Sequence, residues 1–427
     1  MKPFGKITLR KGIVHACNSF ASDSFYRNTL YLLLNMGIAT VTGFLFVLIC
    51  AHLYSQTDFG YATSLLGALG VATAFSNVGM NRTLVRFMGK SSKKSQDLVT
   101  GIFLVSGFAI LSGLVLSRYF SSFGIEHPDA MVVIVFVATV FLMSIKALFD
   151  NVFIAIRESS GTLIENTLFN VVRLFFPVLV VGSGYLGIFG AQLVAVLFAL
   201  VASMIVLRRY HGFTFLVKPS KSSMSGKWRY AIGSYTSDLT GGLPASVVPI
   251  IVVAKLGPVA GALWFVAMRI INVLLSVSAS INQAMFAEMS NAEGSINRFL
   301  KKATVSMYSV LTPISIAVFV LAPYILRIFH GNYVSAEHVL RLMTVFALIG
   351  VANYITGSIL QVYKLVIYLT LVNIANALVV IVYCLYFANS LNGIAVGWVL
   401  GEIVNFVLFV GGGVFVTHRN HGALVID

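Results

Sequence analysis

Charged residues are scarce in this chain of 427 residues. Asp, Glu, Lys and Arg together make up 10% of the sequence, whereas apolar residues make up 58%. A soluble domain contains about 25% charged residues, so the composition excludes an ordinary soluble fold. Apolar stretches of roughly 20 residues, the length of a helix that crosses a bilayer, recur along the whole chain. The composition therefore indicates a polytopic membrane protein.

Cysteine is rare as well. The three cysteines, Cys17, Cys50 and Cys384, lie in the N-terminal segment or in apolar stretches, and no Cys-His cluster offers a metal site. The sequence contains no G-x-x-x-x-G-K-[ST] loop, which excludes ATP hydrolysis through that motif. We expect no metal, no cofactor, no catalytic residue and no binding to nucleic acid.

Twelve apolar segments are long enough to span a membrane, so we predict an all-α fold with about 12 transmembrane helices. The predicted spans are Tyr31–Ala51, Tyr61–Val78, Leu98–Ser117, Met131–Phe149, Thr162–Val181, Ile188–Leu207, Tyr230–Ala254, Gly261–Ala279, Ala303–Leu326, Leu342–Leu360, Val366–Ala388 and Ile394–Val416.

Basic residues outnumber acidic ones, 29 against 14. With a cytoplasmic N-terminus, most Lys and Arg fall at the cytoplasmic ends of spans, Lys146 among them. The outside segments collect only Arg118, Lys255, Arg327 and Arg341, while Arg173 and Arg269 remain within spans. The positive-inside rule then places both termini in the cytoplasm.

A polar segment divides the chain in the middle. Residues 208–230 (RRYHGFTFLVKPSKSSMSGKWRY) form the longest polar interruption, with six spans on each side. We predict a basic cytoplasmic segment at 1–30 without a cleavable signal, a lobe at 31–207, a cytoplasmic linker at 208–230, a second lobe at 231–416 and a cytoplasmic tail at 417–427. Two six-helix lobes with the same orientation are one repeat arrangement of transporters.

Two stretches resemble a known family. "LYSQTDFGYATSLLGALGVATAFSNVGMNRTLVRFMGK" (Leu53–Lys90) is similar to the opening signature of bacterial polysaccharide flippases, which runs through Phe-Gly and an apolar span to Val-Arg-Phe. "PIIVVAKLGPVAGALWFVAMRIINVLLSVSASINQAMFAEMS" (Pro249–Ser290) resembles the matching segment of the second half. One departure is Ala287, where the family often has Pro, which puts the helix ending there in doubt.

The resemblance implies an O-antigen or exopolysaccharide flippase of the multidrug, oligosaccharidyl-lipid and polysaccharide exporter superfamily. Such proteins have two six-helix lobes around a central cavity that opens to alternate sides of the bacterial cytoplasmic membrane. The implied substrate is an oligosaccharide on a polyprenyl pyrophosphate. H⁺ or Na⁺, membrane lipids and polysaccharide polymerase or chain-length machinery are the implied partners.

Arg173 stands in the middle of the fifth span, ~16 Å from its cytoplasmic end at 1.5 Å per residue. An intramembrane arginine is by default a functional candidate. Its planar guanidinium group has paired N–H donors that can bind two phosphate oxygens at once. We predict that Arg173 lines the cavity and meets the anionic head group. The alternative is a structural partnership with a buried acid or backbone carbonyl of the same lobe.

Two acids within spans are candidates for ion coupling, Asp238 and Glu402. Asp238 has a second interpretation as the ion-pair partner of Arg269 from the neighbouring span, and Arg269 is otherwise a second cavity cation. Asp238 precedes the stretch LTGGLPASVVP, which is expected to bend or break the helix and to point to a binding region. The residues expected to bend or break the helix are Gly241, Gly242, Pro244 and Pro249.

Arg82 and Arg86 lie one helical turn apart at the cytoplasmic end of the second span. They are either anchors near anionic lipid or cations at the inner mouth of the cavity. Eight intramembrane amides are either sugar-binding groups or interhelical hydrogen-bonding groups, namely Asn35, Asn170, Gln192, Asn272, Asn353, Asn373, Asn376 and Asn405.

Two other functions remain open. A glycan polymerase or ligase requires a substantial outside loop, and the predicted outside loops, such as RYFSSFGIEHPDA and HGNYVSAEHV, are short. A cation-coupled multidrug exporter of the same superfamily is expected to use acids and aromatic residues, so Arg173 argues against it.

Overall fold

The computed structural model describes residues 24–125, 128–220, 225–291, 296–362 and 365–420. The predictions made for residues 1–23 and 421–427 therefore lie outside the described residues. Within the described ranges the secondary structure is helical, without a strand. Twelve helices in these ranges are long and apolar enough to cross a membrane, one for each predicted span. The chain is an all-helical, multi-pass membrane protein.

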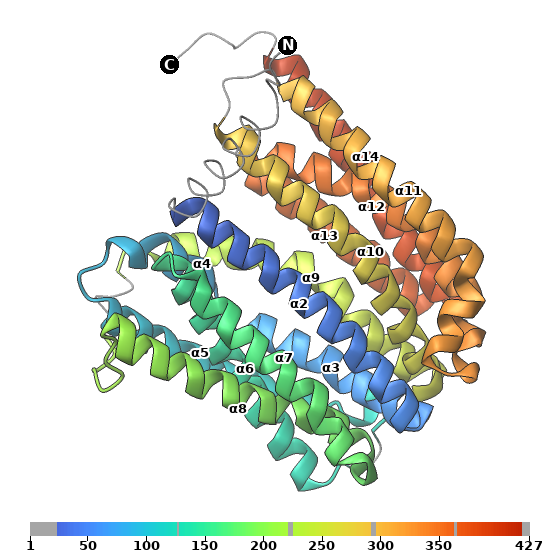
Figure 1. Cartoon of the computed structure of the whole chain (residues 1–427), viewed down its shortest axis with the longest axis horizontal. Coiled ribbons are helices and arrows are strands. Elements are labelled where there is room, and N and C mark those ends of the chain that lie inside the picture. The colour runs from blue at the N-terminus through green and yellow to red at the C-terminus, as the bar shows by residue number, and fades with distance from the viewer. Residues whose placement is uncertain (1–23, 126–127, 221–224, 292–295, 363–364, 421–427) are drawn as a thin grey trace, which may run out of the picture.

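The first half of the chain forms one bundle of helices, shown in blue to green in Figure 1. Its helices are α2 (Ser24–Leu53), α3 (Gln56–Ser76), α4 (Met80–Phe87), α5 (Lys94–Ser117), α6 (Ala130–Ala155), α7 (Ser159–Leu179) and α8 (Gly184–His211). α7 packs between α2 and α8, and α6 packs against α5 and α8.

The second half forms the other bundle, in yellow-green to red (Figure 1). Its helices are α9 (Trp228–Leu256), α10 (Pro258–Asn291), α11 (Ile296–Phe329), α12 (Glu337–Val362), α13 (Val366–Tyr386) and α14 (Leu391–Asn420). α13 packs between α9 and α14, and α12 packs against α11 and α14. These pairs repeat those of the first bundle, as expected for two halves built on one plan.

The two bundles meet mainly along five spanning helices. α3 packs against both α9 and α10, and α2 packs against α10 and α11. Buried apolar side chains of both bundles form one continuous cluster, and rings cross the boundary as in the pairs Phe44–Phe329, with centroids 5.2 Å apart, and Phe59–Phe265, 5.8 Å apart. Side chains on these helices, or packed against them, are therefore the ones that can act between the bundles.

The second predicted span ends earlier than expected, and its basic end is a separate helix. α3 ends at Ser76, and the backbone turns at Val78 and Gly79, which have φ of 44° and 73°. A side chain at Gly79 would clash with the carbonyl oxygen of Ala231 on α9, because its Cβ would lie 2.0 Å away. Arg82 and Arg86 therefore lie on the short α4 rather than on the spanning helix.

α9 corrects a second expectation. The helix runs without interruption from Trp228 to Leu256, although Pro244 and Pro249 lie inside it. Gly241 and Gly242 are helical as well. Transmembrane helices tolerate such residues because neighbouring groups satisfy the freed backbone carbonyls. The helix is therefore not broken at these residues, and the predicted bend stays a prediction. α10 likewise continues to Asn291, past Ala287, so the absence of proline there leaves the helix intact.

Candidate functional site

Arg173 of α7 lies against α2, the helix that borders the second bundle. Its guanidinium stacks over the ring of Phe46, with Cζ 4.1 Å from the ring centroid. Its Nε is buried and has no hydrogen-bond partner. No acid lies within ion-pair distance of it among the described residues. A cation–π contact stabilises the charge but leaves the fork of N–H donors free for an anion.

Arg269 reaches the same helix from the other bundle. Its Nη2 donates to the carbonyl oxygens of Ala39 and Thr40, 3.1 and 3.2 Å away, and its Nε is buried without a partner. The guanidinium lies on the surface of Gly43, where a Cβ atom would be 1.5 Å from Nη2. The glycine is what allows this side chain to approach α2 so closely.

The two arginines are neighbours across the boundary between the bundles. Phe46 and Gly43 are three residues apart on α2 and therefore lie on one face of that helix. Their charges are close enough to act on each other. Two like charges in an apolar setting repel each other, so an anion near both arginines would be stabilised by both. Sequence reasoning had no means of placing Arg269 beside Arg173, because the two residues are 96 positions apart.

Asp238 does not pair with Arg269, contrary to one of the sequence-based interpretations. It accepts two hydrogen bonds from Arg82, from Nε to Oδ2 and from Nη2 to Oδ1, both 3.0 Å long. This bidentate pair joins α4 of the first bundle to α9 of the second. The hydrogen bond to Asp238 raises the pKa of the Arg82 guanidinium. The Arg82 and Asp238 side chains are 60% and 46% exposed, so the pair is accessible to competing ions.

Arg86 has a different environment from Arg82. It is exposed, and its guanidinium lies over the ring of Tyr230, 4.3 Å from the centroid. That contact again joins α4 to α9. Both basic residues of α4 are thus attached to the second bundle, an arrangement that neither the lipid-anchor nor the cavity-mouth interpretation had included.

Lys146, which the charge distribution had assigned to the cytoplasmic end of its span, is a buried residue of α6. Its Nζ donates to Asp150 Oδ2 at 2.8 Å and to Asn166 Oδ1 at 2.6 Å, and lies 4.0 Å from Glu165 Oε1. Asn166 in turn donates to Asp150 Oδ1 at 2.9 Å. Sequence reasoning missed this cluster, although Lys146 and Asp150 have the spacing of a helical ion pair.

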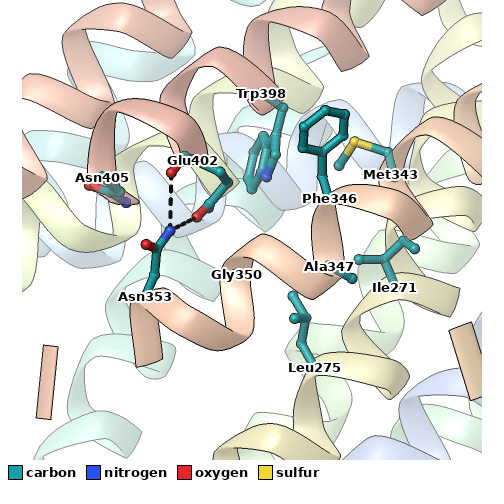
Figure 2. Close-up of a pocket in the computed structure, with 10 residues that line it drawn as sticks. All are labelled: Ile271, Leu275, Met343, Phe346, Ala347, Gly350, Asn353, Trp398, Glu402 and Asn405. Carbon is teal, nitrogen blue, oxygen red and sulfur yellow. Dashed lines mark hydrogen bonds between the residues drawn. The ribbon is translucent and has the colours of Figure 1, made fainter. Parts of the chain in front are cut away.

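Glu402 lines a hollow of about 210 Å³ inside the second bundle (Figure 2). The hollow lies among α10, α12 and α14, and Trp398, Phe346 and Met343 supply its apolar wall. Asn353 donates to a carboxylate oxygen of Glu402 at 2.6 Å and to its backbone carbonyl at 3.2 Å. The side-chain oxygens of Asn353 and Asn405 are buried without partners. A carboxylate beside two amide oxygens can ligate a hard cation.

The remaining predicted amides give a mixed outcome. Asn170 donates to the backbone carbonyl of Asn166 at 2.7 Å within its own helix, which is a local structural bond. Asn353 links α12 to α14, as an interhelical bonding group should. Whether any of the eight amides binds sugar stays a prediction.

Sequence and structural comparisons place the chain among known proteins. The fold is that of a multi-pass membrane protein with two six-span bundles. A family model described as "Polysaccharide biosynthesis protein" matches residues 25–293, more than half of the chain. The chain belongs to this family. None of the curated proteins matches its sequence.

Solved structures share the fold at low sequence identity. One is described as "Lipid II flippase MurJ, inward closed conformation", with a TM-score of 0.70, 13% identity, and coverage of 90% of this chain and 87% of that one. Another is the "Inward-facing conformation of a multidrug resistance MATE family transporter of the MOP superfamily", with a TM-score of 0.60, 16% identity, and coverage of 93% and 96%. These likenesses show the fold that the sequence predicted.

Proposed function

We propose that the chain is a flippase, which moves a lipid-linked oligosaccharide from the cytoplasmic to the outer leaflet of the bacterial cytoplasmic membrane. The two bundles alternate in opening to either side, and the glycan and its pyrophosphate pass between them while the lipid tail stays in the bilayer. Membership of the polysaccharide biosynthesis family supports this proposal. So does the flippase whose structure shares the fold.

The observation that carries the proposal is the pair Arg173 and Arg269. Each arginine comes from a different bundle, each keeps an unpartnered Nε, and both lie against α2. A pyrophosphate has several oxygens that two guanidinium forks can bind together. Arg82 and Arg86 on α4 would meet the same group earlier, at the cytoplasmic side. The pair on α4 and the pair Arg173 and Arg269 would therefore bind an anionic head group one after the other.

Ion coupling is assigned to Glu402 rather than Asp238 in this proposal. Asp238 is already neutralised by Arg82, whereas no cation of the described residues lies within ion-pair distance of Glu402. The carboxylate of Glu402 would bind H⁺ directly, or would ligate Na⁺ together with the unpartnered oxygens of Asn353 and Asn405. Substitution of Glu402 by Gln would keep the hydrogen bond from Asn353 through the amide oxygen and remove the charge.

The proposal is tested in the organism that produces the protein. Deletion of the gene should abolish surface polysaccharide and cause the complete, unpolymerised lipid-linked unit to accumulate. Wild type should rescue, whereas Arg173→Ala should restore less than about a tenth of the surface glycan, because a lost charge-assisted hydrogen bond costs about 1.5–3 kcal/mol and 1.4 kcal/mol is a factor of ten. Arg209→Ala, an exposed arginine of α8, is the matched control.

Two results would contradict the proposal. Full rescue by an Arg173→Ala protein, expressed at the wild-type level, would exclude the role of that charge. Unchanged surface glycan in the deletion strain, with no accumulated intermediate, would exclude the function itself.

Export of organic cations is the second candidate, and the hollow around Glu402 favours it. A carboxylate facing Trp398 and Phe346 is suited to a cationic aromatic compound. The transporters of multidrug resistance among the solved structures share the fold. If deletion leaves the glycan unchanged, increased sensitivity of the deletion strain to cationic drugs would support this candidate.

A further inference from the structure

The cluster around Lys146 inside the first bundle contains one more acid than base. Lys146 and Asp150 of α6 and Glu165 of α7 are its ionisable members. The exposed fractions of their side chains are 7%, 23% and 1%, so all three are largely removed from water. One ammonium faces two carboxyl groups in an apolar helix bundle. If both acids were ionised, the cluster would contain an uncompensated negative charge.

The hydrogen bonds show which acid is compensated. Asp150 accepts from Lys146 at one oxygen and from Asn166 at the other. The strong bonds of Lys146 go to Asp150 and Asn166, at 2.8 and 2.6 Å. Glu165 is 4.0 Å from the ammonium, and neither of its oxygens has a hydrogen-bond partner. Asp150 is thus bonded as a carboxylate, whereas Glu165 is not.

No other ionisable side chain faces Glu165 from the helices packed against α7, which are α2, α6 and α8. α6 carries only Lys146 and Asp150 as ionisable residues, α2 has none between Tyr31 and Cys50, and α8 has none between Tyr185 and Arg208. α8 contributes only the hydroxyl of Ser203, which lies near the Glu165 carboxyl. On α7 itself, Arg173 is eight residues away and stacks on Phe46.

We propose that Glu165 is a proton-binding site, neutral in this conformation, whose proton is released when α7 and α6 bring Lys146 closer. Burial disfavours a charged carboxyl that lacks a partner. In the release step the O–H bond of Glu165 breaks, the proton passes to water and the carboxylate keeps the electron pair. Lys146 neutralises that carboxylate by moving closer than the 4.0 Å that separates the two groups in this conformation.

The site is distinct from the hollow at Glu402, which lies in the other bundle. α7 also carries Arg173, so a movement of α7 that follows the proton would shift the cation assigned to the head group. A role for this proton in driving export rests on the proposed function. Proton binding by Glu165 is independent of that function and can be measured on the purified protein without any substrate.

Infrared spectroscopy of the purified full chain tests the proposal through the carbonyl stretch of a protonated carboxyl group. Glu402 is a second carboxyl in an apolar hollow, so the measurement uses a Glu402→Gln background. At neutral pH we expect the band to be present, to disappear as the pH is raised, and to be absent after Glu165→Gln. Gln keeps the shape of the neutral acid, so this variant should fold. Glu158→Gln, just before α7, is the matched control and should keep the band.

A second variant tests the shared ammonium. Asp150→Asn removes the competing carboxylate, so Lys146 becomes available to Glu165 and the band should titrate at lower pH. An unchanged titration midpoint in this variant would overturn the shared-ammonium account. Persistence of the band in Glu165→Gln, or its absence at neutral pH when Glu165 is present, would overturn the proton site. Loss of the band when Na⁺ replaces K⁺ at constant pH would make the cluster a sodium site instead.

Discussion

Individual charged residues are the main candidates for function in this protein, because the apolar background makes each of them energetically costly. A central arginine costs about 2.5–3.5 kcal/mol on insertion scales, and the structure shows how Arg173 and Arg269 are kept. One stacks on Phe46, and the other donates to carbonyl oxygens of α2. Neither uses an acid, which leaves their charge available. The sequence identified both arginines but not their environment.

The pairing of individual residues could not be predicted from the sequence. The positions of Asp238 within a predicted span and of Arg82 at the end of one were sufficient to make both residues candidates. These positions could not show that the two residues form a pair, because they are 156 positions apart and belong to different bundles. Lys146 was assigned to a cytoplasmic end because the positive-inside rule counts charges without regard to partners. Its hydrogen-bond partners, Asp150 one turn along α6 and Asn166 on the next helix, make its burial possible.

The pair Arg82–Asp238 predicts a charge-swap result. Arg82→Asp or Asp238→Arg places like charges between α4 and α9 and should reduce surface glycan about fivefold, the equivalent of roughly 1 kcal/mol for an exposed pair. The double variant Arg82→Asp/Asp238→Arg should restore it. Surface glycan in the deletion strain is the measurement, and Arg209→Asp is the control. Failure of the double variant, at normal expression, would show that the residues act separately.

At the scale of elements, glycines decide how closely the bundles approach. A Cβ on Gly60 of α3 would lie 1.8 Å from the carbonyl oxygen of Pro258, and one on Gly67 would lie 2.7 Å from that of Ser246. These close approaches run along α3 where it meets α9 and α10. The sequence placed Gly67 in the second predicted span and Gly60 directly before it. Only the packing shows that backbone atoms of the other bundle occupy the space beside both glycines.

Gly60→Leu should therefore destabilise the contact between the bundles. Overpacking costs about 1–3 kcal/mol, which should lower the thermal midpoint of the purified protein. Gly107→Leu on α5 is the matched control, because nothing lies within 4 Å of its Cβ position. Equal midpoints for Gly60→Leu and wild type would show that α3 and the second bundle are not held this closely in the membrane.

Element positions were largely predictable, because hydropathy reports membrane spans directly. Each of the twelve predicted spans corresponds to one helix. Two local features were not predictable. α4 is separated from α3 by the turn at Gly79, which depends on the approach of Ala231. α9 continues through Pro244 and Pro249, because its neighbours tolerate the lost hydrogen bonds.

For the whole molecule, the repeated packing of the two bundles is the main structural result. α2, α7 and α8 pack in the first bundle as α9, α13 and α14 pack in the second. The contacts that join the bundles run through α2, α3 and α4 of the first bundle and α9, α10 and α11 of the second. They include the charged groups Arg269, Arg82 and Asp238. Rotation of one bundle against the other would break and remake these contacts, as alternating access requires.

Transport by the purified protein tests the central claim most directly. Lipid-linked glycan extracted from the deletion strain is incorporated into liposomes with the protein, and a glycosidase added outside measures how fast protected glycan becomes accessible. Wild type should make the glycan of the inner leaflet accessible to the glycosidase. With Arg173→Ala, or in liposomes without protein, the glycan of the inner leaflet should stay protected. Exposure by Arg173→Ala at the wild-type rate, or no exposure by wild type, would contradict the assignment of a flippase that binds its substrate through this arginine.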